Sequence, residues 1–243
     1  MGRGDLPPLR SLPRFFVAAL QETEEPLEPG FRFEIPEDEL KKLRHVLRMD
    51  TGDQIVVLPG DGRILRCEID RREAVIVALE GMAPQPKRRI TLAQGIPKPE
   101  KLEEVVRMGT EMGVAEFWLF PSHRTVVKWD DKKRADRLRR LSSIAREAAE
   151  VCFRGDVPTI HFLDSLKAVL ERDPAAIVLS ESEKPMPSLP DVLRDQCSLV
   201  IGPEGGWEPR EVALIGDRGV TLGPLVLRVD TAAAAACALA LQG

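Results

Sequence analysis

Residues 198–241 constrain the fold more than any other stretch of the chain. An apolar run at 199–201 breaks at the turn Gly202-Pro203-Glu204-Gly205-Gly206, which predicts a buried strand that ends in a tight loop. A helix should follow this loop at 209–216, because Pro209 suits the first turn of a helix. The loop therefore lies between a strand and a helix, where backbone amides are free to meet a ligand.

A second turn follows the same plan. A short strand at 220–222 breaks at Gly223-Pro224, and a last helix begins near Thr231 with an alanine run at 232–236 that allows close backbone packing. Open α/β sheets bind small molecules at the carboxyl ends of their strands, so two such turns predict a ligand cleft. Ordinary loop chemistry is the alternative that either Gly-Pro turn favours when it is taken alone.

The rest of the chain is predicted to form a loose tail and two domains. Residues 1–13 are rich in proline, glycine and arginine and predict the tail, and residues 14–84 predict a small domain of antiparallel strands with one short helix at 37–47. From 88 to 243 strands and helices alternate, which favours an α/β fold with a mainly parallel sheet. The strands of both domains are expected at 54–58, 63–70, 74–79, 90–94, 115–120, 158–163 and 175–180, and the long helices at 99–112 and 131–152.

Composition excludes several classes of protein. The four cysteines and three histidines show no metal or disulfide spacing, so no metal is expected. No apolar run approaches the about 20 residues that span a bilayer, and the N-terminus has no signal-peptide core, which predicts a cytoplasmic protein. The net charge of −4 argues mildly against a nucleic-acid partner, but basic residues outnumber acidic ones at 122–146. A solvated helix face explains that basic stretch equally well.

Two motifs, IGPEGGW at 201–207 and LGPLVLRVDTAAAAA at 222–236, resemble the signature of the SPOUT methyltransferases. Within that superfamily they resemble the ribosomal small subunit RNA methyltransferase E family. The resemblance implies a C-terminal domain with a deep trefoil knot, a homodimer, and methyl transfer from S-adenosylmethionine to N3 of a uridine in 16S rRNA of the small ribosomal subunit. RHVLRM and TGDQIVVLPGDG, at 44–49 and 51–62, resemble the PUA-like β-barrel domain with which the family grips RNA.

The resemblance places the cofactor on the main chain of three loops. The cofactor-binding residues it implies are Leu179, Ser180, Gly202, Pro203, Glu204, Gly205, Leu222, Gly223, Leu225 and Leu227. Arg228 and Glu204 are the predicted catalytic residues, because a guanidinium stabilises the negative charge of a deprotonated uridine imide and Glu204 can orient the cofactor. An ion pair of Arg228 with Asp230, and capping of a helix end by Glu204, are the structural alternatives.

Six residues are predicted to contact RNA, with ordinary surface charge as the alternative for each. They are Arg14, Arg44, His45, Arg48, Arg124 and Arg154. Arg124 lies in residues 121–126, which resemble a P-x-x-S-x-R-S-V-like loop of the family, and Arg154 ends a stretch where the family has E-Q-S-x-R. Val151 replaces the glutamine there, which weakens the transfer of substrate identity. Two alternatives therefore stay open: another SPOUT activity, on ribose 2'-O or guanosine N1, and a non-catalytic RNA-binding ribosome assembly factor.

Overall fold

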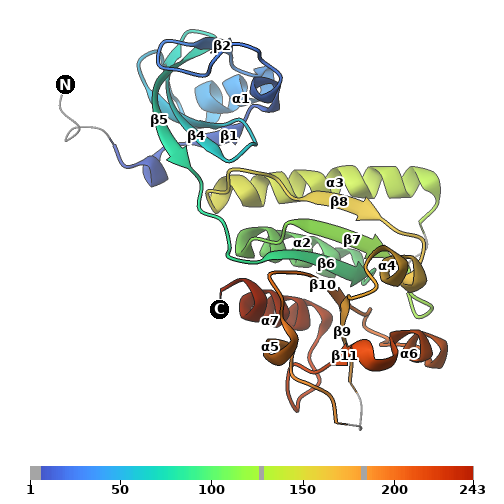
Figure 1. Cartoon of the computed structure of the whole chain (residues 1–243). Coiled ribbons are helices and arrows are strands. Elements are labelled where there is room, and N and C mark those ends of the chain that lie inside the picture. The colour runs from blue at the N-terminus through green and yellow to red at the C-terminus, as the bar shows by residue number, and fades with distance from the viewer. Residues whose placement is uncertain (1–6, 126–128, 182–184, 243) are drawn as a thin grey trace. The chain divides into compact units, whose positions relative to one another are not determined.

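The computed structural model describes residues 7–125, 129–181 and 185–242, which form two compact units (Figure 1). Unit 1 holds the described residues of Met1–Pro84 together with Ala149–Val157. Unit 2 holds the described residues of Gln85–Ala148 and Pro158–Gly243. The sequence placed all of 88–243 in one domain, so the membership of Ala149–Val157 in unit 1 departs from that expectation.

Unit 1 is built on a five-stranded sheet in the order β1-β3-β4-β5-β2. Its strands are β1 Arg14–Phe16, β2 Arg32–Glu34, β3 Gln54–Leu58, β4 Arg63–Asp70 and β5 Glu73–Met82. The strands predicted to be antiparallel, β3, β4 and β5, pair in that way, and β2 also pairs with β5 in antiparallel. The sheet as a whole is mixed, because β1, which was not predicted as a strand, pairs with β3 in parallel. The connection between β1 and β3 is long enough for the crossover that a parallel pair requires.

An apolar core lies on each face of this sheet. Along β3, Ile55 and Val57 pack into one apolar core, and the alternating Val56 and Leu58 pack into another, as the period of two in a strand dictates. The second core also contains Ala149, with Phe153 and Val157 packed against it. The returning segment Ala149–Val157 therefore covers one face of the sheet of unit 1.

The helical parts of unit 1 are short. The helix expected at 37–47 is present as α1 Glu37–Lys41, which continues into the π-helical turn η3 Lys42–Val46. Two 3-10 turns, η1 Leu9–Ser11 and η2 Ala18–Gln21, precede it. The described part of the predicted loose tail is packed: Leu12 is buried, and Arg66 donates a hydrogen bond to the carbonyl of Pro7 at 3.0 Å. Residues 1–6 of that tail lie outside the described residues.

Unit 2 contains a six-stranded sheet in the order β11-β9-β10-β6-β7-β8, in which every pair is parallel (Figure 1). The parallel α/β architecture expected from the alternation of elements is confirmed. The strands are β6 Arg89–Gly95, β7 Glu116–Phe120, β8 Thr159–Phe162, β9 Ile177–Leu179, β10 Gln196–Ile201 and β11 Gly219–Val220. The helices are α2 Pro99–Met112, α3 Asp131–Val151, α4 Leu166–Arg172, α5 Leu189–Val192, α6 Pro209–Ile215, the turn η4 Gly216–Arg218, and α7 Val229–Leu241.

The strand order of unit 2 creates a switch point. The chain builds β7 and β8 on one side of β6 and then β10, β9 and β11 on the other. Ligands bind at such points, beyond the carboxyl ends of the strands. The last helix, α7, packs against α2, β6 and β10, and its buried Ala233, Ala236 and Ala240 allow that close approach. Among the helices that the structure describes, none combines the length and the apolar character needed to cross a membrane.

Candidate functional site

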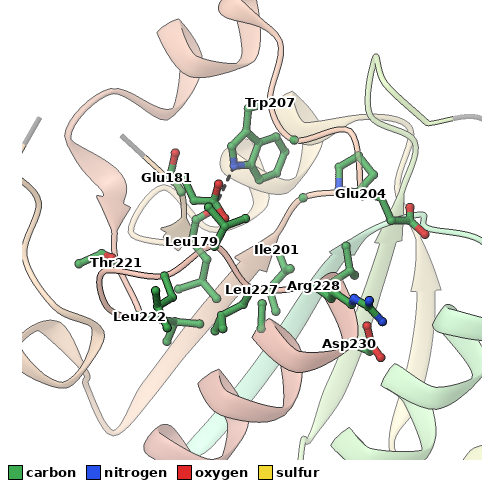
Figure 2. Close-up of a pocket in the computed structure, with 18 of the residues that line it drawn as sticks. Leu179, Glu181, Ile201, Glu204, Trp207, Thr221, Leu222, Leu227, Arg228 and Asp230 are labelled. Atoms are coloured by element: carbon green, nitrogen blue, oxygen red, sulfur yellow. Dashed lines mark hydrogen bonds between the residues drawn. The ribbon is translucent and has the colours of Figure 1, made fainter. Parts of the chain in front are cut away.

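A pocket of about 640 Å³ lies at the carboxyl ends of β9, β10 and β11 (Figure 2). Its size falls within the range of roughly 300–1,000 Å³ that is typical of small-molecule sites. Of the predicted cofactor-binding residues, all except Gly205 line it, and the predicted catalytic Arg228 lines it as well. These lining residues are Leu179, Ser180, Gly202, Pro203, Glu204, Leu222, Gly223, Leu225, Leu227 and Arg228.

Gln94 and Trp207 hold the first two loops of the pocket together. The buried amide of Gln94 donates hydrogen bonds to the carbonyls of Gly202 at 3.1 Å and Ile201 at 3.3 Å. The indole N–H of Trp207 donates to the carbonyl of Leu179 at 3.0 Å, as the dashed line in Figure 2 marks. Trp207 also lies against Gly202, where an added Cβ would approach the indole ring to 3.1 Å. A side chain at position 202 would therefore crowd the indole ring.

The third loop begins where β11 ends. The Ser180 N–H donates to the carbonyl of Val220 at 3.0 Å, which joins the first loop to the third. The hydroxyl of Thr221 donates to the Gly223 carbonyl at 2.9 Å and accepts from the Gly223 N–H at 3.0 Å. Gly223 has φ +137°, a conformation that favours glycine. Figure 2 shows the side chains of Leu222 and Leu227 around the pocket that this turn completes.

Arg228 lies at the N-cap of α7 with its side chain exposed to solvent. Its predicted structural partner, Asp230, instead pairs with Lys101 of α2, with the Nζ and Oδ2 atoms 2.5 Å apart. The hydrogen bond from Lys101, with the nearby positive charges of Lys101 and Arg228, holds the pKa of Asp230 below its usual value. Within the described part of the chain, Arg228 makes no ion pair, so its guanidinium is free to meet a ligand.

Glu204 is also exposed, and its carboxylate accepts a hydrogen bond from the Lys98 backbone N–H at 3.1 Å. Lys98 is the N-cap residue of α2, directly before Pro99. A carboxylate at a helix N-terminus satisfies an otherwise free amide and interacts favourably with the helix dipole. Of the two roles considered for Glu204, this contact supports the capping role.

The loop at 121–125 is tied to the pocket. The guanidinium of Arg124 donates to the carbonyl of Gly205 at 2.7 Å, beside the pocket loop. The buried carboxylate of Glu211 accepts from the Ser122 hydroxyl and from the His123 N–H, each at 3.2 Å. Sequence reasoning missed Glu211, whose only signal was its place in the capping box of α6. Val126, which ends the resembling motif, lies outside the described residues.

Arg14 and Arg154 belong to unit 1. The Arg14 guanidinium lies 4.6 Å from the centroid of the Phe153 ring and donates to the Val151 carbonyl at 3.4 Å. Partial burial, and then the charge of Arg10, lower the pKa of Arg14 from its ordinary value. Arg154 is only 7 % exposed and pairs with Asp156 at 2.9 Å. Both arginines thus contact the returning segment, and the burial of Arg154 favours a structural role over contact with RNA.

Arg44, His45 and Arg48 lie in or just beyond the π-helical turn. Arg44 pairs with Asp50 and donates to the carbonyl of Arg71 at 2.8 Å. His45 and Arg48 are exposed, and Arg48 has a positive φ of 56°. These two side chains therefore face solvent, while Arg44 is partly engaged. Within the described residues, no group of three or more His, Cys, Asp and Glu side chains is arranged to hold a metal ion.

Comparison with known proteins places this arrangement in a family. Residues 83–241 match a family model described as an RNA methyltransferase domain. The ribosomal RNA small subunit methyltransferase E of Bacillus subtilis is 32 % identical over 240 residues, which cover 90 % of this chain and 92 % of that protein. The protein of the same name from Mycobacterium tuberculosis is 32 % identical over 206 residues, 79 % of each chain.

Solved structures agree with the sequence comparisons. The ribosomal RNA small subunit methyltransferase E of Neisseria gonorrhoeae, bound to S-adenosyl methionine, has a TM-score of 0.79 at 26 % identity and covers 93 % of this chain and 95 % of its own. A Legionella pneumophila protein, described as a methyltransferase in complex with the cofactor SAM, has a TM-score of 0.80 at 26 % identity, with 94 % and 96 % covered. The chain belongs to the ribosomal RNA small subunit methyltransferase E family.

Proposed function

We propose that this protein transfers a methyl group from S-adenosylmethionine to N3 of a uridine in 16S rRNA of the small ribosomal subunit. The observation that carries the proposal is the pocket at the ends of β9, β10 and β11, which gathers the three loops around Arg228, a guanidinium with no ion-pair partner among the described residues. The relatives from Neisseria gonorrhoeae and Legionella pneumophila, solved with the cofactor bound, support the choice of cofactor.

The pocket suits this cofactor in size and in lining. Its volume of about 640 Å³ suits a small-molecule cofactor, and Leu179, Leu222 and Leu227 line it with apolar side chains that exclude water. When bound, S-adenosylmethionine supplies a methyl group on a positively charged sulfur. The loops hold cofactor and base in reacting geometry, and such orientation contributes roughly 7–11 kcal/mol to the lowering of a barrier. No covalent nucleophile is needed for this reaction.

Arg228 is the proposed catalytic residue. A uridine must lose its N3 proton before it is methylated, and the anion gains stability from a guanidinium that itself stays protonated. Arg228 has such a group exposed beside the pocket. Glu204 is proposed to act on the pocket loop by fixing it to the start of α2. The N3 proton passes to solvent water, because the Arg228 guanidinium stays protonated and cannot accept it.

We propose that cations of unit 1 and cations of unit 2 each contact the RNA. His45 and Arg48 face solvent in unit 1, and Arg14, Arg44 and Arg124 retain part of their donor capacity beside their protein contacts. Unit 1 is proposed to be the PUA-like domain and unit 2 the knotted SPOUT domain. The knot is proposed because residues 201–207 and 222–236 resemble the SPOUT signature. A homodimer in the cytoplasm, without a metal, completes the proposal.

Nucleoside mass spectrometry of rRNA from a strain that lacks this protein tests the substrate. Loss of 3-methyluridine from 16S rRNA, restored by the wild-type gene and not by an Arg228→Ala copy, is the expected result. Loss of a ribose-methylated nucleoside or of 1-methylguanosine would assign another SPOUT activity. Calorimetric titration with S-adenosylmethionine tests the non-catalytic alternative, which requires no binding at micromolar concentrations.

A further inference from the structure

Two opposite charges lie close together at the edge of the pocket without pairing. Arg228 is the N-cap of α7 and Asp230 follows in the first turn of the same helix. Figure 2 shows both side chains at one edge of the pocket, with the guanidinium beside the carboxylate. An aspartate this close to a guanidinium that has no ion-pair partner among the described residues would ordinarily pair with it, because charge-assisted hydrogen bonds are stronger than neutral ones. Another positively charged side chain must therefore compete with Arg228 for the Asp230 carboxylate.

The competitor is Lys101. It lies in the first turns of α2, the helix that packs against α7, and its Nζ is 2.5 Å from Oδ2 of Asp230. The two side chains are 38 % and 23 % exposed, so water screens this pair only in part. Lys101 is separated from Asp230 by 129 positions in the sequence and still lines the same pocket. The pair thus joins the start of α2 to the start of α7.

The other carboxylate oxygen of Asp230 is available. Its Oδ1 is buried and has no hydrogen-bond partner within the described residues. A buried acceptor without a donor costs free energy, so the carboxylate gains whenever a donor reaches it. Arg228 is the N-cap of the same helix, and its charge already acts on Asp230. Lys101 fixes the carboxylate through Oδ2, in an orientation that leaves Oδ1 buried and without a donor among the described residues. Loss of Lys101 would leave both oxygens without a donor, so Asp230 would turn toward Arg228.

We propose that Lys101 is a positioning residue that holds Asp230 away from Arg228 and so keeps the Arg228 guanidinium free for the substrate. The inference rests on the proposed function of Arg228 and adds to it. It also explains why an acidic side chain is tolerated two residues from a guanidinium that must stabilise an anion: α2 supplies the balancing charge.

Lys101→Met tests the proposal, because it removes the ammonium and keeps an unbranched side chain. With Asp230 paired to Arg228, kcat for RNA methylation should fall by about tenfold to a hundredfold, as misplacement of a reacting group does. The Kd for S-adenosylmethionine, measured by calorimetry, should change less than about threefold, since Lys101 acts through Arg228. Lys101→Arg, which keeps the positive charge, should retain most of the activity.

The double variant Lys101→Met/Asp230→Asn is the decisive measurement. It removes the carboxylate that would capture Arg228, so kcat should recover to within about threefold of wild type. A merely structural loss would not be rescued by a second loss. Lys167→Met is the matched control, because Lys167 pairs with Glu171 on α4 and does not line the pocket, and its kcat should not change. Thermal unfolding of each variant confirms that it is folded.

The outcomes separate this inference from the proposed function. If Arg228→Ala loses activity while Lys101→Met keeps it, or while the double variant stays as slow as Lys101→Met, the positioning role is wrong and the proposed function stands. If wild-type protein fails to methylate small-subunit rRNA, or Arg228→Ala is as active as wild type, the proposed function fails and this inference fails with it.

Discussion

Glu204 shows how one contact decides between two roles for a residue. Its carboxylate accepts from the Lys98 N–H at the start of α2, so we expect Glu204→Ala to lower the free energy of unfolding by about 1 kcal/mol, as loss of a helix cap does. Glu204→Gln keeps an acceptor oxygen and should lose less. Urea unfolding measures both, with Glu147→Ala on the exposed face of α3 as the control. A tenfold drop in kcat for Glu204→Gln, with stability kept, would show that its charge is catalytic.

Trp207 makes a hydrogen bond through its indole N–H and a stacking contact through its ring, and one substitution can remove the first while keeping the second. Trp207→Phe removes the indole N–H that donates to Leu179 and keeps a ring to stack on Phe120, whose centroid lies 6.4 Å away. The freed loop should weaken binding of S-adenosylmethionine by about 1 kcal/mol, or roughly fivefold in Kd. Calorimetry measures this change. Trp129→Phe, which alters an indole that does not line the pocket, should leave the affinity unchanged.

At the scale of elements, the sequence predicted most of unit 2 because each element carries its own local signal. The helix at 99–112 was predicted to the residue, since its start has proline and its end has Gly113 in the left-handed conformation. β1, β2, α4 and α5 were not predicted. β1 has only three residues, Arg14–Phe16. β2 has only three residues, Arg32–Glu34, α5 has only four, and α4 has seven, so none repeats a period often enough to be recognised.

The pocket was predictable in part for the same reason. Except for Leu179 and Ser180, the predicted loop residues lie in the two contiguous motifs that carry the resemblance, and the structure brings all three loops together at adjacent strand ends. Lys101 and Glu211 were not predictable. Lys101 meets Asp230 through the packing of α2 on α7, and Glu211 meets Ser122 across 89 positions, so nothing near either residue in the sequence signals its partner.

The link between α6 and the loop at 121–125 gives an element-scale prediction. Glu211→Gln removes the negative charge that accepts hydrogen bonds from the Ser122 hydroxyl and from the backbone N–H groups of His123 and Glu208. Hydrogen bonds to a charged group contribute about 1.5–3 kcal/mol each, so we expect the free energy of unfolding to fall by about 2 kcal/mol. Hydrogen exchange of residues 121–125 should become faster. Ser165→Ala, which loses the N-cap of α4, should destabilise the protein without that local change.

At the scale of the whole molecule, the sequence predicted two domains with a boundary near residue 84, but it did not predict that Ala149–Val157 belongs to unit 1. The boundary near residue 84 has a proline-rich signal, but the return of Ala149–Val157 to unit 1 has none. That return depends on contacts between distant residues. Glu150 accepts from the Phe16 N–H at 3.2 Å, and Gly62 donates to the Gly155 carbonyl at 3.0 Å. The membership of Ala149–Val157 in unit 1 therefore follows from the folded structure and not from any local sequence signal.

Gly155 provides the test of that division. An added Cβ at Gly155 would lie 2.6 Å from Cα of Gly62, and the backbone must shift to accept it, so Gly155→Ala should destabilise unit 1 by about 1–3 kcal/mol. The rate of cysteine alkylation reports the opening of each unit separately, because each unit holds a buried thiol. Burial raises the pKa of Cys67 in unit 1, and that of Cys237 in unit 2, to about 12. Neither thiol should react at neutral pH until its unit opens.

Peptide-resolved mass spectrometry of the alkylated protein gives the readout. Gly155→Ala should speed labelling of Cys67, by about tenfold for each 1.4 kcal/mol lost, and leave Cys237 slow. Gly113→Ala is the reciprocal variant, because φ is +106° there and a Cβ would lie 2.3 Å from Pro86 within unit 2. This variant should speed the alkylation of Cys237 and leave the alkylation of Cys67 slow. Equal acceleration of both thiols by either variant would show that the two units unfold as one, and that Ala149–Val157 does not stabilise unit 1 separately.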